Sequence, residues 1–177
     1  MNSSPAPTTR VPHMMRNRGV DRDVTRLFDP ANACDSSAPW PPDEPDWVVP
    51  VATWIAHRKE LRSRRHPVGI RLSPDDDISD LAEVHARSQA IDPAGIAFIS
   101  ILFPVYTDGR GFSLAQLLRR EYGWTGEMRA VGDVLIDTMH YLARCGFDSF
   151  VLKDGHDPLQ ALRALETFSA SYQRSYS

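Results

Sequence analysis

Five short apolar or β-branched runs, each followed by a helix-forming pattern, constrain the fold of this chain more than any other feature. The runs occupy residues 48–51, 68–72, 96–103, 127–131 and 149–152. Strands that alternate with helices along a chain are typical of a parallel sheet with right-handed crossovers. We therefore predict an α/β fold built of about five βα units around a parallel sheet.

Helix signals lie between and after these runs. Ser113 and Gln116 form a capping box, and Asp157 is an N-cap residue followed by Pro158 at the first helical position. Elsewhere, apolar residues recur at the spacing of one helix face. These patterns predict helices over residues 53–64, 78–88, 113–123 and 133–145, and from residue 157 onward.

Charged side chains inside two predicted strands bear on the shape of the sheet. Arg71 and Arg129 interrupt runs that are otherwise apolar, which is unusual for a parallel sheet covered on both faces. A partial (β/α) barrel with a polar interior would accommodate both arginines, and so would a sheet with one exposed face. The sequence leaves an open five-stranded sheet and a partial barrel as alternatives.

Proline is concentrated near the amino terminus. Nine of the 14 prolines lie at or before residue 50, among Ser, Asp and Thr clusters with little apolar periodicity. Because proline fixes φ and removes a backbone donor, it opposes both helices and strand ladders. We therefore predict a mostly disordered extension over residues 1–46, followed by a single α/β domain over residues 47–173.

Cysteine content and charge exclude several functional classes. Cys34 and Cys145 are the only cysteines, so the chain has no CxxC motif and cannot form a four-cysteine cluster. We expect no metal site and a reducing, cytoplasmic location. The formal net charge of −3 argues against nucleic acid as the main partner. No apolar run approaches the roughly 20 residues of a membrane span, so we expect no membrane association.

Polar residues gather where the predicted strands end, which is where parallel α/β folds carry their functional loops. Asp108 and Asp133 are our candidate catalytic bases. Backbone N–H groups at a helix start, together with arginine or lysine, would hold a phosphate, sulfite or carboxylate. The candidate ligand-binding residues are Arg71, Thr107, Asp108, Gly109, Arg110, Gly111 and Lys153.

The loop at residues 107–114 partly matches a dinucleotide-binding fingerprint. Gly109 and Gly111 provide a G-x-G between a predicted strand and a predicted helix. Leu114 stands in the place of the third glycine, where a branched side chain obstructs close packing of helix on strand. We therefore predict no cofactor, with a flavin or nicotinamide cofactor as the lesser alternative.

Five motifs follow one another in order along the second half of the chain. They are GIRLSPDDD at 69–77, FPVYTDGRGFS at 103–113, GEMRAVGDVLID at 126–137, RCGFDSF at 144–150 and FSASYQ at 168–173. Together they resemble the DUF934 family of small bacterial proteins of unknown function. The chain departs from the family pattern in its long proline-rich amino terminus and in Leu102, where an acidic residue is common.

The resemblance implies a place in sulfur assimilation. Proteins of this family are usually encoded beside sulfite reductase and other sulfate-assimilation enzymes, and they are labelled oxidoreductases involved in sulfite reduction. We accordingly expect a cytoplasmic accessory protein of assimilatory sulfite reduction that acts with sulfite reductase or its electron donor. Its contact surface would be the basic cluster at residues 57–66 or the strand ends near Asp108 and Arg110.

Two alternatives stay open from the residues themselves. One is a small enzyme that binds an anionic ligand at the carboxyl ends of the strands, where Arg110 and Lys153 would hold the anion. The other is a structural half-barrel subunit that self-associates into a homo-oligomer. The sequence does not decide whether the chain is itself an enzyme.

Overall fold

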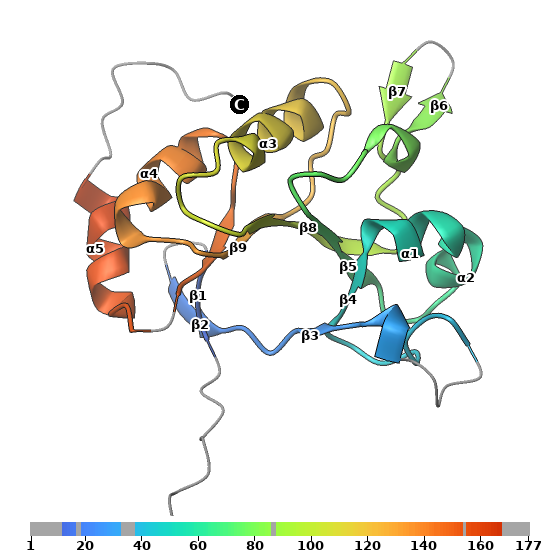
Figure 1. The fold of residues 1–177 in the computed structure, drawn as a ribbon, viewed down its shortest axis with the longest axis horizontal. Coiled ribbons are helices and arrows are strands. Elements are labelled where there is room, and N and C mark those ends of the chain that lie inside the picture. Colours follow the sequence, from blue (N-terminus) through green and yellow to red (C-terminus); the bar gives the residue numbers. More distant parts are fainter. Residues whose placement is uncertain (1–11, 17–18, 33–37, 86–87, 154, 168–177) are drawn as a thin grey trace, which may run out of the picture.

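The computed structural model describes residues 12–16, 19–32, 38–85, 88–153 and 155–167 (Figure 1). The strands are β1 (His13–Arg16), β2 (Gly19–Arg22), β3 (Arg26–Leu27), β4 (Trp47–Pro50), β5 (Val68–Leu72), β6 (Glu83–His85), β7 (Ser88–Ala90), β8 (Ile96–Phe103), β9 (Met128–Gly132) and β10 (Ser149–Val151). The helices are α1 (Val51–Ala56), α2 (Arg58–Arg62), α3 (Arg110–Arg120), α4 (Ile136–Arg144) and α5 (Pro158–Thr167), with 3₁₀ turns η1 (Pro30–Asn32) and η2 (Ser79–Leu81).

The five predicted strands lie side by side in chain order. The main sheet has the order β2-β1-β10-β9-β8-β5-β4-β3, and the pairs from β4 to β10 are all parallel. Figure 1 shows these strands as an arc with the helices outside it, which is the arrangement of one part of a (β/α) barrel. The α/β prediction is confirmed, and of the two architectures the protein adopts the curled partial barrel.

The apolar core lies between the outer face of this arc and the helices. Ile70, Ile99 and Ala130, from three neighbouring strands, are fully buried in one cluster with Leu118 of α3 and Met139 of α4. Burial of the helices' apolar faces against the strands supplies the main drive for folding. Among the described residues, no helix has the length and apolar character needed to cross a lipid bilayer.

The amino-terminal segment corrects the prediction of disorder over residues 1–46. β1 pairs antiparallel with β10 and β3 pairs parallel with β4, so the segment is attached to both edges of the arc and crosses its open side (Figure 1). Met15 and Phe28 of this segment are buried in the main core. The prediction is wrong for residues 12–16, 19–32 and 38–46, whereas 1–11, 17–18 and 33–37 lie outside the described residues.

The proline-rich stretch at residues 38–45 has a hydrogen bond of its own, from the Glu44 N–H to the Pro42 carbonyl at 2.8 Å, and further contacts come from outside it. Arg64 donates to the carbonyl oxygens of Pro41, at 2.8 Å, and Pro42. The Asp43 carboxylate accepts the backbone N–H groups of Arg65 and His66 at 3.0 and 3.1 Å. Proline content misled the prediction here because proline lacks a donor but keeps its carbonyl acceptor.

The connection from β5 to β8 also differs from the prediction, which places a helix over residues 78–88. Its ordered turn is η2, which buries Leu81 and in which Ser79 N–H donates to the Asp77 carboxylate at 2.9 Å. The antiparallel hairpin of β6 and β7 follows. Apolar residues three apart, here Ile78, Leu81 and Val84, fit a 3₁₀ turn as well as a helix. This unit has no α-helix among its described residues.

Candidate functional site

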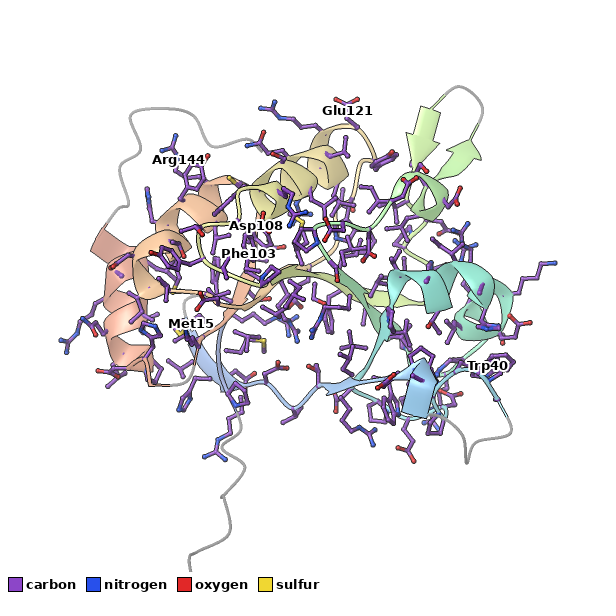
Figure 2. The ribbon with its side chains drawn as sticks, viewed as in Figure 1. Met15, Trp40, Phe103, Asp108, Glu121 and Arg144 are labelled. Carbon is purple, nitrogen blue, oxygen red and sulfur yellow. The ribbon has the colours of Figure 1, made fainter. Side chains whose placement is uncertain are left out.

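Charged loops at the carboxyl ends of β5, β8, β9 and β10 are hydrogen-bonded to one another, and we call residues 73–77, 104–111, 132–134, 153 and 155–157 the rim. Arg110 joins the first two loops. Its Nε and Nη2 donate to Asp108 at 3.0 and 2.7 Å, and its Nη1 donates to Asp75. Figure 2 labels Phe103 at the end of β8 and Asp108 in the loop that follows it.

Asp133 joins the other loops of the rim. One carboxylate oxygen accepts Lys153 Nζ at 2.6 Å, and the other accepts the backbone N–H of Tyr106 at 3.0 Å. Gly132, just before Asp133, has a φ of 97° and lies so close to the Phe103 carbonyl that a Cβ would overlap it. The rim is therefore a continuous set of contacts from β5 to β10.

Both candidate bases on the rim are already engaged. The side-chain hydrogen bond from Arg110 is the largest cause that lowers the pKa of Asp108. The hydrogen bond from Lys153, followed by that from the Tyr106 N–H, lowers the pKa of Asp133. A carboxylate with a lowered pKa accepts a proton poorly at neutral pH. The arrangement therefore favours holding the loops together over general-base chemistry.

The candidate ligand-binding residues fall into two separate places. The rim contains Thr107, Gly109, Arg110, Gly111 and Lys153, together with Asp108. The helix α3 begins at Arg110, earlier than the capping box at Ser113 predicts, because Asp108 accepts the backbone N–H of Arg110 at 3.1 Å. Arg71 lies elsewhere, within β5, where its side chain faces the inside of the arc.

Arg71 belongs to a line of polar side chains that we call the interior row. Arg71 of β5, Ser100 of β8, Arg129 of β9, Ser149 of β10 and Arg16 of β1 are successive register partners across the sheet. Register partners on neighbouring strands point to the same face, so the five side chains form one layer of the barrel interior. Sequence analysis missed this row because Arg16 lies in the segment predicted to be disordered.

Glu127 neutralises the middle of the interior row. Its Oε1 accepts Arg129 Nη2 at 2.9 Å and the Ser149 hydroxyl at 2.7 Å, while its Oε2 lies 2.8 Å from Arg16 Nη2. Arg129 is 4% exposed, whereas the Arg16 side chain is 47% exposed, so the charge network is buried at its centre and reaches solvent at Arg16. The Glu127 carboxylate thus contacts one side chain from each of β9, β10 and β1, and it fixes these three strands relative to one another.

Arg71 has fewer partners than Arg129. Its Nε donates to the Ser100 hydroxyl at 3.2 Å, and that hydroxyl donates to the Ile70 carbonyl at 3.1 Å. Burial is the largest cause that lowers the pKa of Arg71, and the charge of Arg129 acts in the same direction, against the attraction of Asp23. Within the described part of the chain, no acceptor bonds to its two terminal nitrogens.

The basic cluster at residues 57–66 mostly serves local contacts. Arg62 lies 3.2 Å from the carboxylate of Asp92, and Arg64 and His66 lie 3.6 and 3.2 Å from that of Asp43. Arg64 also binds the proline-rich stretch described above. These side chains hold neighbouring loops, which leaves fewer of them available to a partner protein.

Metal-ligating side chains do not gather in the described residues. No group of three or more His, Cys, Asp or Glu side chains among them is placed to hold a metal ion. Cys145 is buried just after α4, and Cys34 lies outside the described residues.

Comparison with known proteins gives one match. A family model described as a bacterial protein of unknown function, DUF934, matches residues 69–177, which include the rim, Arg71, Ser100, Glu127 and Arg129. No curated protein and no solved structure matches the chain.

Proposed function

Since the chain belongs to the DUF934 family, we propose that it is an accessory protein of assimilatory sulfite reduction, and that its rim docks on sulfite reductase. The gene neighbourhood that the family resemblance implies supports the choice of pathway, and the exposed side chains of the rim support the choice of surface. The alternative contact at residues 57–66 is less suited, because that cluster has no large exposed apolar side chain, whereas the rim has two.

The observation that supports this proposal best is a pair of exposed apolar side chains on a loop of the rim that is held in place by hydrogen bonds. Val105 and Tyr106 are each 51% exposed in the loop between β8 and α3. Asp133 accepts the N–H of Tyr106, and the Asp108 N–H donates to the Val105 carbonyl at 3.0 Å, so the loop is held on both sides. Tyrosine is enriched at protein interfaces, and a loop ordered before binding loses less conformational entropy when a partner arrives.

The charge of the rim indicates the chemistry of the partner's surface. Carboxylates outnumber cations on its described residues: Asp75, Asp76, Asp77, Asp108, Asp133 and Asp157 against Arg110 and Lys153. An acidic surface associates best with a basic one, and salt weakens such association. The proposed docking face of sulfite reductase is therefore basic.

The lowered pKa values of the rim carboxylates favour an accessory role for the protein over an active site on the rim. Asp108 and Asp133 have lowered pKa values because Arg110 and Lys153 bond to them. Neither group is poised near neutral pH, where a general base works best. Their contacts instead keep Tyr106 and its neighbours in one conformation.

Binding of the purified protein to immobilised sulfite reductase tests the proposal, with the electron donor of the reductase in a parallel channel. The substitution Tyr106→Ala removes an exposed anchor and is expected to weaken binding about 30-fold. The matched control is Leu117→Ala, which truncates an exposed apolar side chain about two turns into α3. This control should bind like the wild type, and both variants should keep the wild-type Tm.

Three results would overturn the proposal. They are no binding to the reductase at low salt, equal binding by the Tyr106→Ala variant, and binding to the electron donor only. A strain that lacks the protein should also grow on cysteine but poorly on sulfate. Normal growth of that strain on sulfate would remove the protein from the pathway.

A further inference from the structure

The interior row carries more positive charge than its own carboxylates balance. Three guanidinium groups, those of Arg16, Arg71 and Arg129, face the two carboxylates of Glu127 and Asp23, which leaves one positive charge in excess. Glu127 bonds to Arg16 and Arg129, and Asp23 lies 3.4 Å from Arg129. Among the described residues, Arg71 is therefore the guanidinium of the row without an ion-pair contact.

Arg71 is oriented by the fold although its terminal nitrogens bond to no described acceptor. Ser100 is buried and its hydroxyl donates to the Ile70 carbonyl, so its lone pair is directed at Arg71 Nε. A guanidinium held through Nε presents Nη1 and Nη2 as a pair of donors. That pair matches the spacing of two oxygens on a phosphate, sulfate, sulfite or carboxylate group.

The layers on either side of the interior row limit the size of a ligand. Toward the rim, Met14, Leu102, Val131 and Val151 form an apolar cluster on the same face of the sheet. In the other direction, the Phe98 ring covers Gly69 and lies 3.7 Å below the Arg129 guanidinium. Apolar neighbours lower the local dielectric and strengthen the attraction between an anion and an arginine. A small ligand is sufficient to accept hydrogen bonds from both terminal nitrogens of Arg71.

We propose that the interior row binds a small oxyanion of the sulfate, sulfite or phosphate type through the terminal nitrogens of Arg71. The anion balances the excess charge of the row. The cations of the rim are less suited to this task, because Arg110 and Lys153 already bond to carboxylates. This inference does not rest on docking to sulfite reductase, because the two proposals use different residues.

Isothermal titration calorimetry on the full chain tests the inference, with sodium sulfate, sulfite and phosphate as separate titrants and sodium chloride as the control. The substitution Arg71→Gln should weaken oxyanion binding at least about tenfold, because it removes both the charge and the donor pair. The matched variant Arg110→Gln removes a rim arginine and should bind the oxyanion like the wild type. Loss of binding in Arg110→Gln with retention in Arg71→Gln would place the anion on the rim and overturn the inference.

A measurement on the unaltered protein covers the case in which Arg71→Gln does not fold. The side-chain Nε–Hε signal of Arg71 in a ¹⁵N spectrum should shift on addition of the oxyanion, while that of Arg110 should not. The inference is supported if any of the three oxyanions binds and shifts the Arg71 signal. The oxyanion with the highest affinity then identifies the ligand. No heat and no shift with all three would overturn it.

Discussion

The rim and the interior row are built from the same chemistry but differ in burial and in surplus charge. The Arg110 side chain on the rim is 55% exposed, whereas that of Arg129 in the interior row is 5% exposed. Carboxylates are in excess on the rim and guanidinium groups in the row. Water and salt screen an exposed pair, so it contributes little to stability, whereas a buried charge left without its partner is costly. The comparison assigns the centre of the row, Glu127 and Arg129, a role in holding the curl. Arg71 in the row and the exposed side chains of the rim are left for binding.

Loss of the central carboxylate of the row should have the largest effect on stability. Glu127→Gln leaves Arg129 buried with the longer contact to Asp23, and we expect the free energy of unfolding to fall by about 3 kcal/mol. Urea unfolding measures it. The control is Glu121→Gln, at the exposed end of α3 (Figure 2), which should unfold like the wild type. Equal stabilities of the two variants would contradict the structural role assigned to Glu127 in the row.

A smaller loss is expected from Asp23→Asn, which tests whether the amino-terminal segment supplies charge to the row. The Asp23 side chain is largely buried and faces Arg129, so its neutralisation should lower the free energy of unfolding by about 1.5 kcal/mol. Asp21→Asn, two residues earlier on an exposed strand, is the control and should change little. If both variants match the wild type in urea unfolding, the Asp23 carboxylate does not contribute to the stability of the row.

The smallest effect on stability is expected on the rim, and it depends on pH. Asp108 has a lower pKa in the folded chain than its ordinary value of 3.8, chiefly because Arg110 donates to it. Its contribution to stability is therefore full above pH 3.8 and is lost as the pH falls through the lowered folded-state pKa. The Asp108→Asn variant lacks this carboxylate, so its free energy of unfolding should be below that of the wild type above pH 3.8. The difference between the two proteins should shrink as the pH falls below 3.8. A ¹³C titration of the Asp108 carboxyl that gives a pKa at or above 3.8 would contradict the expectation.

Local features of the sequence predicted the central strands well. The predicted runs at residues 68–72 and 96–103 coincide with β5 and β8, and Asp157-Pro158 marks the start of α5. These signals depend on residues close together in the chain, such as an unbroken β-branched run or an N-cap beside a proline. The helix predicted over residues 78–88 was wrong because one apolar spacing does not separate a 3₁₀ turn and a hairpin from a helix.

The candidate site, like the fold, was predicted from the sequence only in part. The sequence placed Asp108, Arg110, Asp133 and Lys153 at strand ends, because parallel strands bring their carboxyl ends to one edge. It identified Arg71 and Arg129 as charges that suit a polar interior. It did not reveal that Asp133 bonds to Lys153 of another loop, or that Asp108 accepts two side-chain nitrogens of Arg110 in its own loop, because both need the distances between side chains.

By itself, the sequence determined the alternation of strands and helices, the membership of the DUF934 family and the charged character of the strand ends. Only the tertiary structure decided that the sheet curls, that β1 and β3 attach the amino-terminal segment to both of its edges, and that Arg16 completes the interior row. The physical reason is that register between strands far apart in the chain depends on packing of the whole sheet. That packing also orders a proline-rich segment whose local composition favours disorder.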